Sequence, residues 1–388
     1  MERSKGQILP LVLFSIVISA VLMVVMFNAT QKVTDKTIAT NASDAAVYSG
    51  GVWVARQLNF MAYTNRAMIA NHVAAGHMVA YVSWSRYVND SVANLNKIAR
   101  FIPYLNSVMA ALEQYAGVNK QLAEASAQVL IPSIDALNRL HSLAQRQAWL
   151  ALRPSKVEEV MRTVLVGYDS DLRLNITSEL SGEAAKNYKP LIDFSIASYR
   201  SALLGAAEIL GPGADGGEMK GMVERSYAGS ERWLNNRNWS QSLVLFKLRK
   251  ESSTSHDLQE SLGEWQAEDR LRYGRWTPKG WKWSTIGRGE ASSDEFMSNY
   301  KGIHSYARKR GSAERELTID LVALATKFDT QTVSRTRMGI DSKGTVISGY
   351  SKSRVYFERP LTGFDSTASE YANLYNPFWK VKLVEAWP

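Results

Sequence analysis

The first hydrophobic block of the chain runs from Ile8 to Phe27 and contains no charged residue. Ser15, Ser19 and Pro10 interrupt it, and Pro10 falls in the first turn, where a missing N–H costs little. A helix of this length spans roughly 30 Å, the thickness of a bilayer's hydrocarbon core. The pattern predicts one transmembrane helix over residues 7–28. Two alternatives stay open: a buried core helix, and a secretory signal, whose apolar region is normally ~7–15 residues long.

The residues after this block predict a long helix from Asn28 to about Ala116, with Pro103 as its first interior proline. Within it, Asn41–Gly51 consists mostly of small side chains, which allow another helix to approach closely. Two adjacent glycines disfavour an isolated helix by about 1 kcal/mol each, so they mark a tight crossing or a break. The residues that we expect to make this packing are Ser43, Ala46, Gly50 and Gly51.

A polar stripe follows on the same predicted helix. Arg56, Asn59, Tyr63 and Arg66 recur at helical spacing and share one face. The stripe predicts a surface for partner binding or self-association. The alternative is that it is only the solvated face of the helix.

Two further helical patterns continue the chain. Val118–Leu152 carries apolar residues at steps of three and four, and Pro132 interrupts the pattern once. Ser155 and Glu158 have the spacing of a capping box, which predicts that a short helix over Val157–Val166 begins here.

The clearest domain boundary is the Gly- and Pro-rich run at 211–217, which follows an apolar helix over Leu191–Leu210. Beyond it, short alternating stretches replace the helical periodicity and predict a mixed, mostly antiparallel β region. The predicted fold class is therefore α+β, with a single N-terminal transmembrane helix, a helical stalk or bundle, and a C-terminal β region. The expected parts are a basic cytoplasmic leader (1–6), the transmembrane helix (7–28), a helical domain (29–210), a linker (211–219) and a basic, Trp-rich, β-containing domain (220–388).

The β region is read from alternating stretches and from the turn residues between them. Pro278-Lys279-Gly280 and Ser342-Lys343-Gly344 are the clearest turns. The order of the strands does not follow from the pattern. The predicted strands are Ser242–Leu248, Trp265–Trp276, Trp281–Ile286, Glu316–Ala325, Ser353–Arg359 and Phe378–Val384.

Composition narrows the class of protein. The 388 residues are 45% hydrophobic, enough for packed cores. The absence of cysteine excludes disulfide scaffolds, thiolate metal sites and thiol nucleophiles. The formal net charge of +9 makes acidic surface polymers, such as polysaccharide or extracellular DNA, plausible partners. The alternative, which we favour, is ordinary solubilising charge on a basic protein.

Patterns for catalysis are weak. The five histidines include no pair at the i,i+4 spacing of metal ligands, and phosphate-binding glycine loops and a nucleophile elbow are absent. Glu264, Glu268 and Asp269 suggest a glycosidase pair, but we expect them to be charge partners of nearby arginines. Those arginines are Arg270, Arg272 and Arg275. We expect no catalytic residue, no metal site and no cofactor.

A Trp- and Arg-rich stretch invites a binding interpretation. Arg275, Trp276, Trp281 and Trp283 could stack on sugars or nucleobases. The alternative is that these aromatic residues form a small core, with basic residues facing outward between them.

The residues before the apolar block indicate orientation and processing. Arg3 and Lys5 are positive, so the positive-inside rule places this end in the cytoplasm and the bulk of the chain outside it. Gly6 before a long apolar helix has the layout of a prepilin signal, cut between Gly6 and Gln7 by a prepilin peptidase. Prepilins generally carry Glu five residues into the mature chain, where this sequence has Leu11.

Two stretches resemble the TadE/TadG-type proteins of the tight-adherence pilus system. Asn41–Gly51, with its Ser43-Asp44-Ala45-Ala46 core, is similar to the Ala/Asp-rich segment that follows their membrane helix. Val355–Pro360 and Glu370–Trp379 resemble their aromatic C-terminal strand and turn. The resemblance covers about 80 of the 388 residues. It implies a minor pilin or pseudopilin-like assembly protein, anchored in the bacterial inner membrane, with its bulk in the periplasm or at the cell surface. The implied partners are other pilus or assembly subunits, and no catalysis is implied.

The sequence therefore predicts a membrane-anchored structural protein of a pilus system. The alternative is a membrane-tethered binding module for polysaccharide or extracellular nucleic acid.

Overall fold

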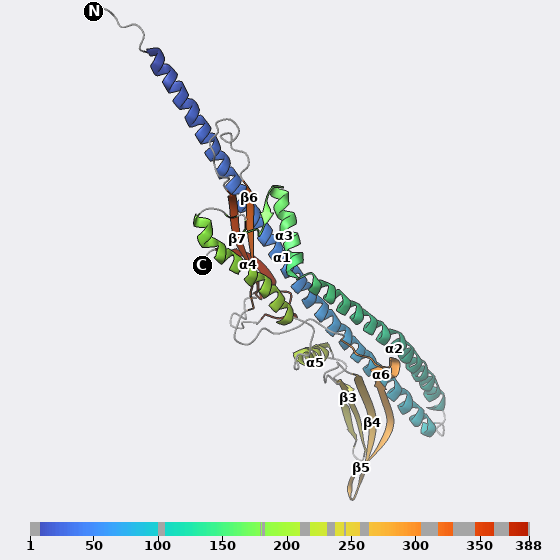
Figure 1. Cartoon of the computed structure of the whole chain (residues 1–388). Helices are drawn as coiled ribbons and strands as arrows, with labels where there is room; N and C mark the ends of the chain where they lie inside the picture. The colour runs from blue at the N-terminus through green and yellow to red at the C-terminus, as the bar shows by residue number, and fades with distance from the viewer. Residues whose placement is uncertain are drawn as a thin grey trace, which may run out of the picture. The chain divides into compact units, whose positions relative to one another are not determined.

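The structure, a computed structural model, is α+β and contains two antiparallel sheets (Figure 1). The predicted leader with Gly6 and Gln7 lies outside the described residues, as do residues 211–217 of the predicted linker. The structure describes residues 8–99, 105–178, 180, 183–209, 218–230, 237–243, 246–256, 264–303, 317–328, 346–360 and 372–386.

The longest element is the helix α1, which runs over 92 residues (Ile8–Ala99). It passes through Gly50 and Gly51 without a break. The prediction that one helix continues to Ala116 is wrong: α1 ends at Ala99, and a second helix, α2, occupies Leu105–Leu150. Pro103 gives the reason, since a proline disfavours helical conformation in the residue before it and removes a helical N–H.

Two compact units divide the chain, and each is assembled from segments far apart in sequence. The first comprises residues 1–60, 148–210 and 310–388, and the second comprises 61–147 and 211–309. The helix α1 contributes residues to both units.

The first unit combines the N-terminal part of α1, two further helices and a four-stranded sheet with the order β1-β6-β7-β8. All neighbouring strands of this sheet are antiparallel. In Figure 1, β6 and β7 run alongside α1. Its other elements are α3 (Pro154–Tyr168), β1 (Arg173–Leu174), α4 (Glu183–Ile209), β6 (Ile319–Phe328), β7 (Val346–Phe357) and β8 (Trp379–Val384).

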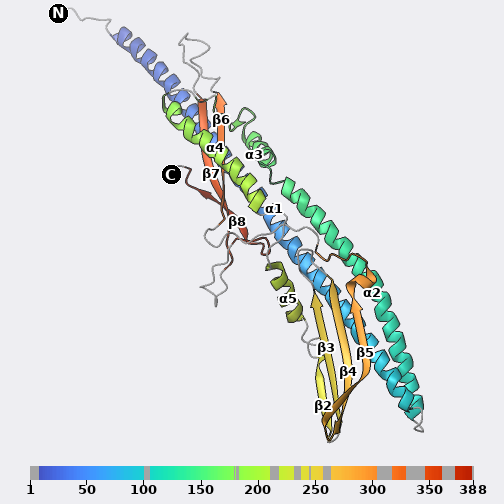
Figure 2. The ribbon, with the colours of Figure 1, turned by 60° about the horizontal axis from the view of Figure 1, so that its bottom comes forward.

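The second unit combines the C-terminal part of α1, most of α2 and a sheet with the sequential order β2-β3-β4-β5, again antiparallel. Figure 2 shows β3, β4 and β5 side by side along this part of α1. Its other elements are α5 (Glu218–Ser230), β2 (Trp239–Leu243), β3 (Phe246–His256), β4 (Trp265–Thr277), β5 (Gly280–Ser292) and α6 (Ser293–Phe296).

The helical predictions for residues 118–210 are confirmed in outline and wrong in one detail. Pro132, which interrupts the predicted pattern, lies inside α2. The helix α3 begins after Arg153, with Pro154 in its first turn and no side-chain cap, so the predicted capping box of Ser155 and Glu158 is absent. A proline at this position is preset for helical φ and needs no N–H, which is why the start moves upstream of the serine.

The strand predictions in the C-terminal region are confirmed for β4 to β8, with shifted ends. The turn at Pro278-Lys279 joins β4 to β5 as expected. The stretch Ser242–Leu248 is instead the end of β2 and the start of β3, because Leu243 pairs with Phe246 in an antiparallel register.

A ring cluster forms the centre of the second unit's core. The indole of Trp265 is fully buried and donates from Nε1 to His72 Nδ1 at 3.3 Å. The hydroxyl of Tyr300 lies 3.0 Å from the same nitrogen. A Cβ at Gly76 would lie 2.7 Å from the indole, so glycine lets the ring pack flat against α1.

Candidate functional site

The N-terminal part of α1 presents an uncovered apolar surface. From Ile8 to Phe27 every side chain is exposed except that of Val24, which is half-buried. Among the described residues this is the one helix with a stretch long and apolar enough to cross a membrane. Soluble proteins rarely expose contiguous apolar surface of this size. The segment is therefore suited to an apolar environment, such as a bilayer or the packed helices of an assembly.

The next part of α1 packs against the sheet of the first unit, and we call this contact surface the seat of the sheet. Ala39, Ala42, Ser43 and Ala46 are fully or almost fully buried. The hydroxyl oxygens of Ser43 and Ser351, on β7, lie 2.5 Å apart and form a hydrogen bond. Small residues bring the helix and the strand to contact distance, so the backbone of β7 rests directly on α1.

Gly349 shows how close this approach is. A Cβ at this position in β7 would collide with the carbonyl group of Ala39. Further along α1, the Ser353 hydroxyl donates to the carbonyl oxygen of Val47 at 2.9 Å. The sheet is thus held by side-chain hydrogen bonds to the helix backbone as well as by packing.

Gly50 and Gly51 face different neighbours. A Cβ at Gly50 would lie 2.7 Å from Met161 Cγ on α3. A Cβ at Gly51 would meet Val381 on β8. Of the four residues expected to pack, Gly50 contacts a helix, Ser43 and Gly51 contact strands, and Ala46 is buried.

The polar stripe separates into one internal residue and three exposed ones. Asn59 binds the backbone of Trp379 at the start of β8: its Nδ2 donates to the carbonyl oxygen, and its Oδ1 accepts from the amide nitrogen, each at 3.0 Å. Its amide therefore has a structural role. Arg56, Tyr63 and Arg66 are exposed.

The Trp-rich stretch forms the end of the β4–β5 hairpin in the second unit. Trp276 pairs with Trp281, and Gly274 pairs with Trp283. Because side chains alternate along a strand, the three tryptophans share one face with Gly274, and Arg275 points to the other. The structure therefore brings together three of the four predicted residues and not Arg275.

Other basic residues replace Arg275 on the tryptophan face. Lys247 Nζ lies 4.3 Å from the ring centroid of Trp281, and the Arg272 guanidinium carbon lies 5.5 Å from that of Trp283. Trp276 is 54% exposed. We call Lys247, Arg272, Trp276, Trp281 and Trp283 the aromatic face. Its mixture of ring surfaces and cations can stack on sugars or bases and attract anions.

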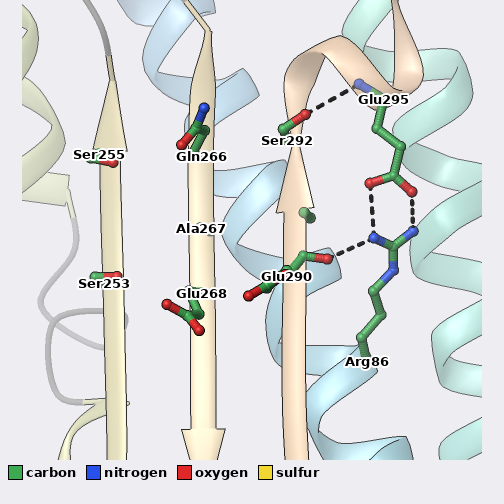
Figure 3. Close-up of a pocket in the computed structure, with 10 residues that line it drawn as sticks. Arg86, Ser253, Ser255, Gln266, Ala267, Glu268, Glu290, Ser292 and Glu295 are labelled. Carbon is green, nitrogen blue, oxygen red and sulfur yellow. Dashed lines mark hydrogen bonds and ion pairs between the residues drawn. The ribbon is translucent and has the colours of Figure 1, made fainter.

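A polar hollow of about 670 Å³ lies at the opposite end of this sheet. In Figure 3 the guanidinium of Arg86 faces the carboxylate of Glu295, and Nη1 also donates to the Glu290 carbonyl oxygen at 2.6 Å. The hydrogen bond from Arg86 lowers the pKa of Glu295. Arg86 is further bound by Glu124, with Nε donating to Oε1 at 2.7 Å. The arginine is therefore neutralised by the protein itself.

The prediction that Asp269 pairs with Arg270, Arg272 or Arg275 is wrong. Asp269 is fully buried, and its carboxylate accepts from the Ser83 hydroxyl at 2.6 Å, from Arg237 Nη1 at 2.9 Å and from Lys250 Nζ. Strand alternation is the reason for Arg270 and Arg272, because it turns them to the face opposite Asp269. Arg275 is on the same face as Asp269 but six residues away, near the end of β4. Glu268 faces solvent, where it pairs with Arg270 and Arg288 as an exposed glutamate should.

The sequence pattern alone does not reveal this buried cluster as a unit. Lys250 is 2% exposed, and burial lowers its pKa even though the Asp269 carboxylate opposes that change. Ser83 lies more than 180 residues from Asp269, so no local pattern connects them. A weak signal existed in the lone aspartate at an apolar position of the alternating stretch Trp265–Leu271.

Comparison of the chain with protein-family models, curated proteins and solved structures gives no match.

Proposed function

We propose that this chain is a membrane-anchored structural protein in which Ile8–Phe27 holds the two units at a bilayer. The observation that carries the proposal is the continuity of α1: one helix begins as an exposed apolar segment and continues as the seat of folded sheets. Transfer of each large apolar side chain out of water is favourable by about 1.5–3 kcal/mol, so the whole segment strongly favours an apolar environment.

Orientation and placement form the second part of the proposal. Arg3 and Lys5 precede the apolar segment and keep their end in the cytoplasm, with the folded units on the outer side of a bacterial inner membrane. The resemblance to TadE/TadG-type proteins supports a role as minor pilin or assembly factor, in contact with other pilus subunits. Ser43 lies in the segment Asn41–Gly51 that carries this resemblance, and its hydroxyl forms a hydrogen bond with Ser351 in the sheet of the first unit. That segment would then join the anchor to the folded part of the protein.

The mass of the mature N-terminus tests the pilin part of this proposal. We expect a chain that begins at Gln7 in cells with a prepilin peptidase and at Met1 in cells without it. The control is a Gly6→Leu variant, which should keep Met1 in both. A wild-type chain that begins at Met1 in both strains would contradict the filament-subunit form and favour a permanently anchored assembly factor.

A second candidate function is binding of acidic polysaccharide or nucleic acid, and the aromatic face favours it. Three tryptophans and two cations share one side of the sheet. Replacing Trp276, Trp281 and Trp283 by Ala should lower retention on heparin or single-stranded DNA at least tenfold. Trp239→Ala is the matched control, since Trp239 is 45% exposed but pairs with Lys250 and lies on the other face. Equal retention of the two variants would remove this function.

A further inference from the structure

The helix α2 carries an apolar column that nothing in the described structure covers. The column repeats every seven residues and every member is exposed: Val108, Tyr115, Leu122, Val129, Ala136 and Leu143. Tyr115 is 72% exposed and Val129 is 70% exposed. A strict seven-residue repeat is the spacing by which one helix packs along another in a coiled coil.

A second column lies beside the first, offset by three and four residues. Leu112 and Leu140 are its exposed apolar members, and Asn119, Ser126 and Ser133 lie between them. Together the columns have the a and d spacing of a helical pair, with polar residues in the middle of one column. The side of α2 next to the second column is buried: Ala116, Ala123, Ala127, Ile131 and Ile134.

Exposed charge is nearly absent around the columns. From Leu105 to Leu137 no exposed residue is charged, in a chain of which 21% is charged. The charged residues of this stretch are half-buried or buried. Glu124 is bound by Arg86, and Asp135 is 1% exposed. The one exposed charge between Leu105 and Leu143 is Arg139, which pairs with Asp135 of the same helix at 2.8 Å. We call the surface formed by the two columns, from Leu105 to Leu143, the uncharged face of α2.

We propose that the uncharged face of α2 is a dimerisation surface that binds the same face of a second copy of this chain, with the two helices parallel and in register. Two copies of a protein with net charge +9 repel each other, and this face lets them meet without placing like charges together. In this arrangement each residue of the two columns faces the same residue of the second copy. The Ser126 hydroxyls of the two copies can then bond each other.

The size of the face agrees with a stable dimer. From Leu105 to Leu143 a helix extends ~58 Å, and a strip ~10 Å wide gives about 580 Å² on each copy. Two copies bury about 1,200 Å² in total, within the range of specific interfaces. A partner with a continuous apolar seam would instead bury the Ser126 hydroxyl without a hydrogen bond, at a cost of about 1–3 kcal/mol.

The natural absence of cysteine makes a direct test possible. Val129→Cys places one thiol on the column. Gln128→Cys is the matched control, because it is adjacent and exposed but about 100° away around the helix. In the full chain in detergent, a short bismaleimide should give at least tenfold more cross-linked dimer with Val129→Cys than with Gln128→Cys. Equal cross-linking of the two variants would overturn the proposal.

A charge-insertion variant supplies the independent measurement. Leu122→Glu with Val129→Glu should raise the dimer dissociation constant at least 100-fold by analytical ultracentrifugation. Gln121→Glu with Gln128→Glu should change it less than threefold.

A monomeric wild-type chain at micromolar concentration would overturn the proposal, and so would cross-linking of Val129→Cys in cells to a different protein. Far-UV circular dichroism establishes that the variants keep their helices. If the glutamate variant does not fold, the comparison of Val129→Cys with Gln128→Cys tests the proposal by itself.

Discussion

At the residue scale, the most consequential side chains are buried polar groups that hold the second unit together. Asp269 accepts hydrogen bonds from a lysine, an arginine and a serine while it is fully buried. Removal of one partner from a buried ion pair is costly because the other charge then has no counter-charge in a low-dielectric environment. The cluster is therefore expected to fix how β4 and β3 rest on α1.

Asp269→Ala should lower the free energy of unfolding by about 3–5 kcal/mol, because Lys250 and Arg237 stay buried without the carboxylate. Urea unfolding followed by circular dichroism measures this. The control is Glu290→Gln, whose partner Arg288 and own side chain are each 53% exposed, so the loss should be at most about 1 kcal/mol. A loss for Asp269→Ala no larger than the control would show that the cluster does not stabilise the fold.

The second unit should also lose stability in mild acid through His72. Burial, and secondarily the charge of His256, lowers the pKa of His72 from 6.5 to about 3. Between these values the unfolded chain binds a proton that the folded chain does not, so stability falls as pH falls. The expected contribution is about 1.4 kcal/mol per pH unit below pH 6.5. Unfolding curves at pH 7.5, 6.5, 5.5 and 4.5 measure it. His72→Gln should flatten the dependence, and an unchanged slope in this variant would assign it to other groups.

At the element scale, the contact of α1 with the two sheets depends on small residues at specific points. A Cβ at Gly349 would meet the carbonyl group of Ala39, and one at Gly289 would meet that of Ser83. In both units a strand backbone lies directly against the helix backbone. This arrangement leaves no space for even one methyl group.

Gly349→Ala should therefore destabilise the first unit by about 1–3 kcal/mol, the usual range for overpacking a filled site. Gly205→Ala on α4 is the control, because no atom lies within 4 Å of a Cβ there. Alanine is the better helix former by about 1 kcal/mol, so the control should be stabilised. Thermal unfolding of the two variants measures the expected loss of stability in the first and the expected gain in the second. Equal effects would indicate that α1 and β7 can move apart at little cost.

Sequence patterns identified most elements but not their contacts. The periodicity of Trp265–Trp276 and the turn at Pro278 were enough to predict the β4–β5 hairpin, because alternation and turn chemistry are local. The seat of β7 on α1 joins residues about 300 positions apart, and nothing local in the sequence records that pairing. The same contrast between local patterns and tertiary contacts holds for the predicted site residues. Trp276, Trp281 and Trp283 share a face as strand spacing dictates, whereas the internal use of Asn59 by Trp379 depends on tertiary structure.

At the scale of the whole molecule, one helix combines two roles that are usually separate. Its first residues are apolar and exposed, and its later residues are the seats of two sheets. In the proposed function, the anchor and the residues that contact each sheet therefore belong to a single continuous helix. This is the property that a structural or assembly protein at a membrane needs, and it gives the proposed function its physical basis.

The most direct test of this account is the location of a single cysteine in intact cells. Lys279→Cys places a thiol in the exposed turn between β4 and β5 of a chain that otherwise has none. The protein should stay in the membrane fraction after carbonate washing. A membrane-impermeant maleimide should label this cysteine without lysis of the inner membrane. A matched variant that also carries Val17→Lys and Val21→Lys should lose membrane retention. Labelling that requires lysis, or recovery of the Lys279→Cys protein in the soluble fraction, would contradict the account.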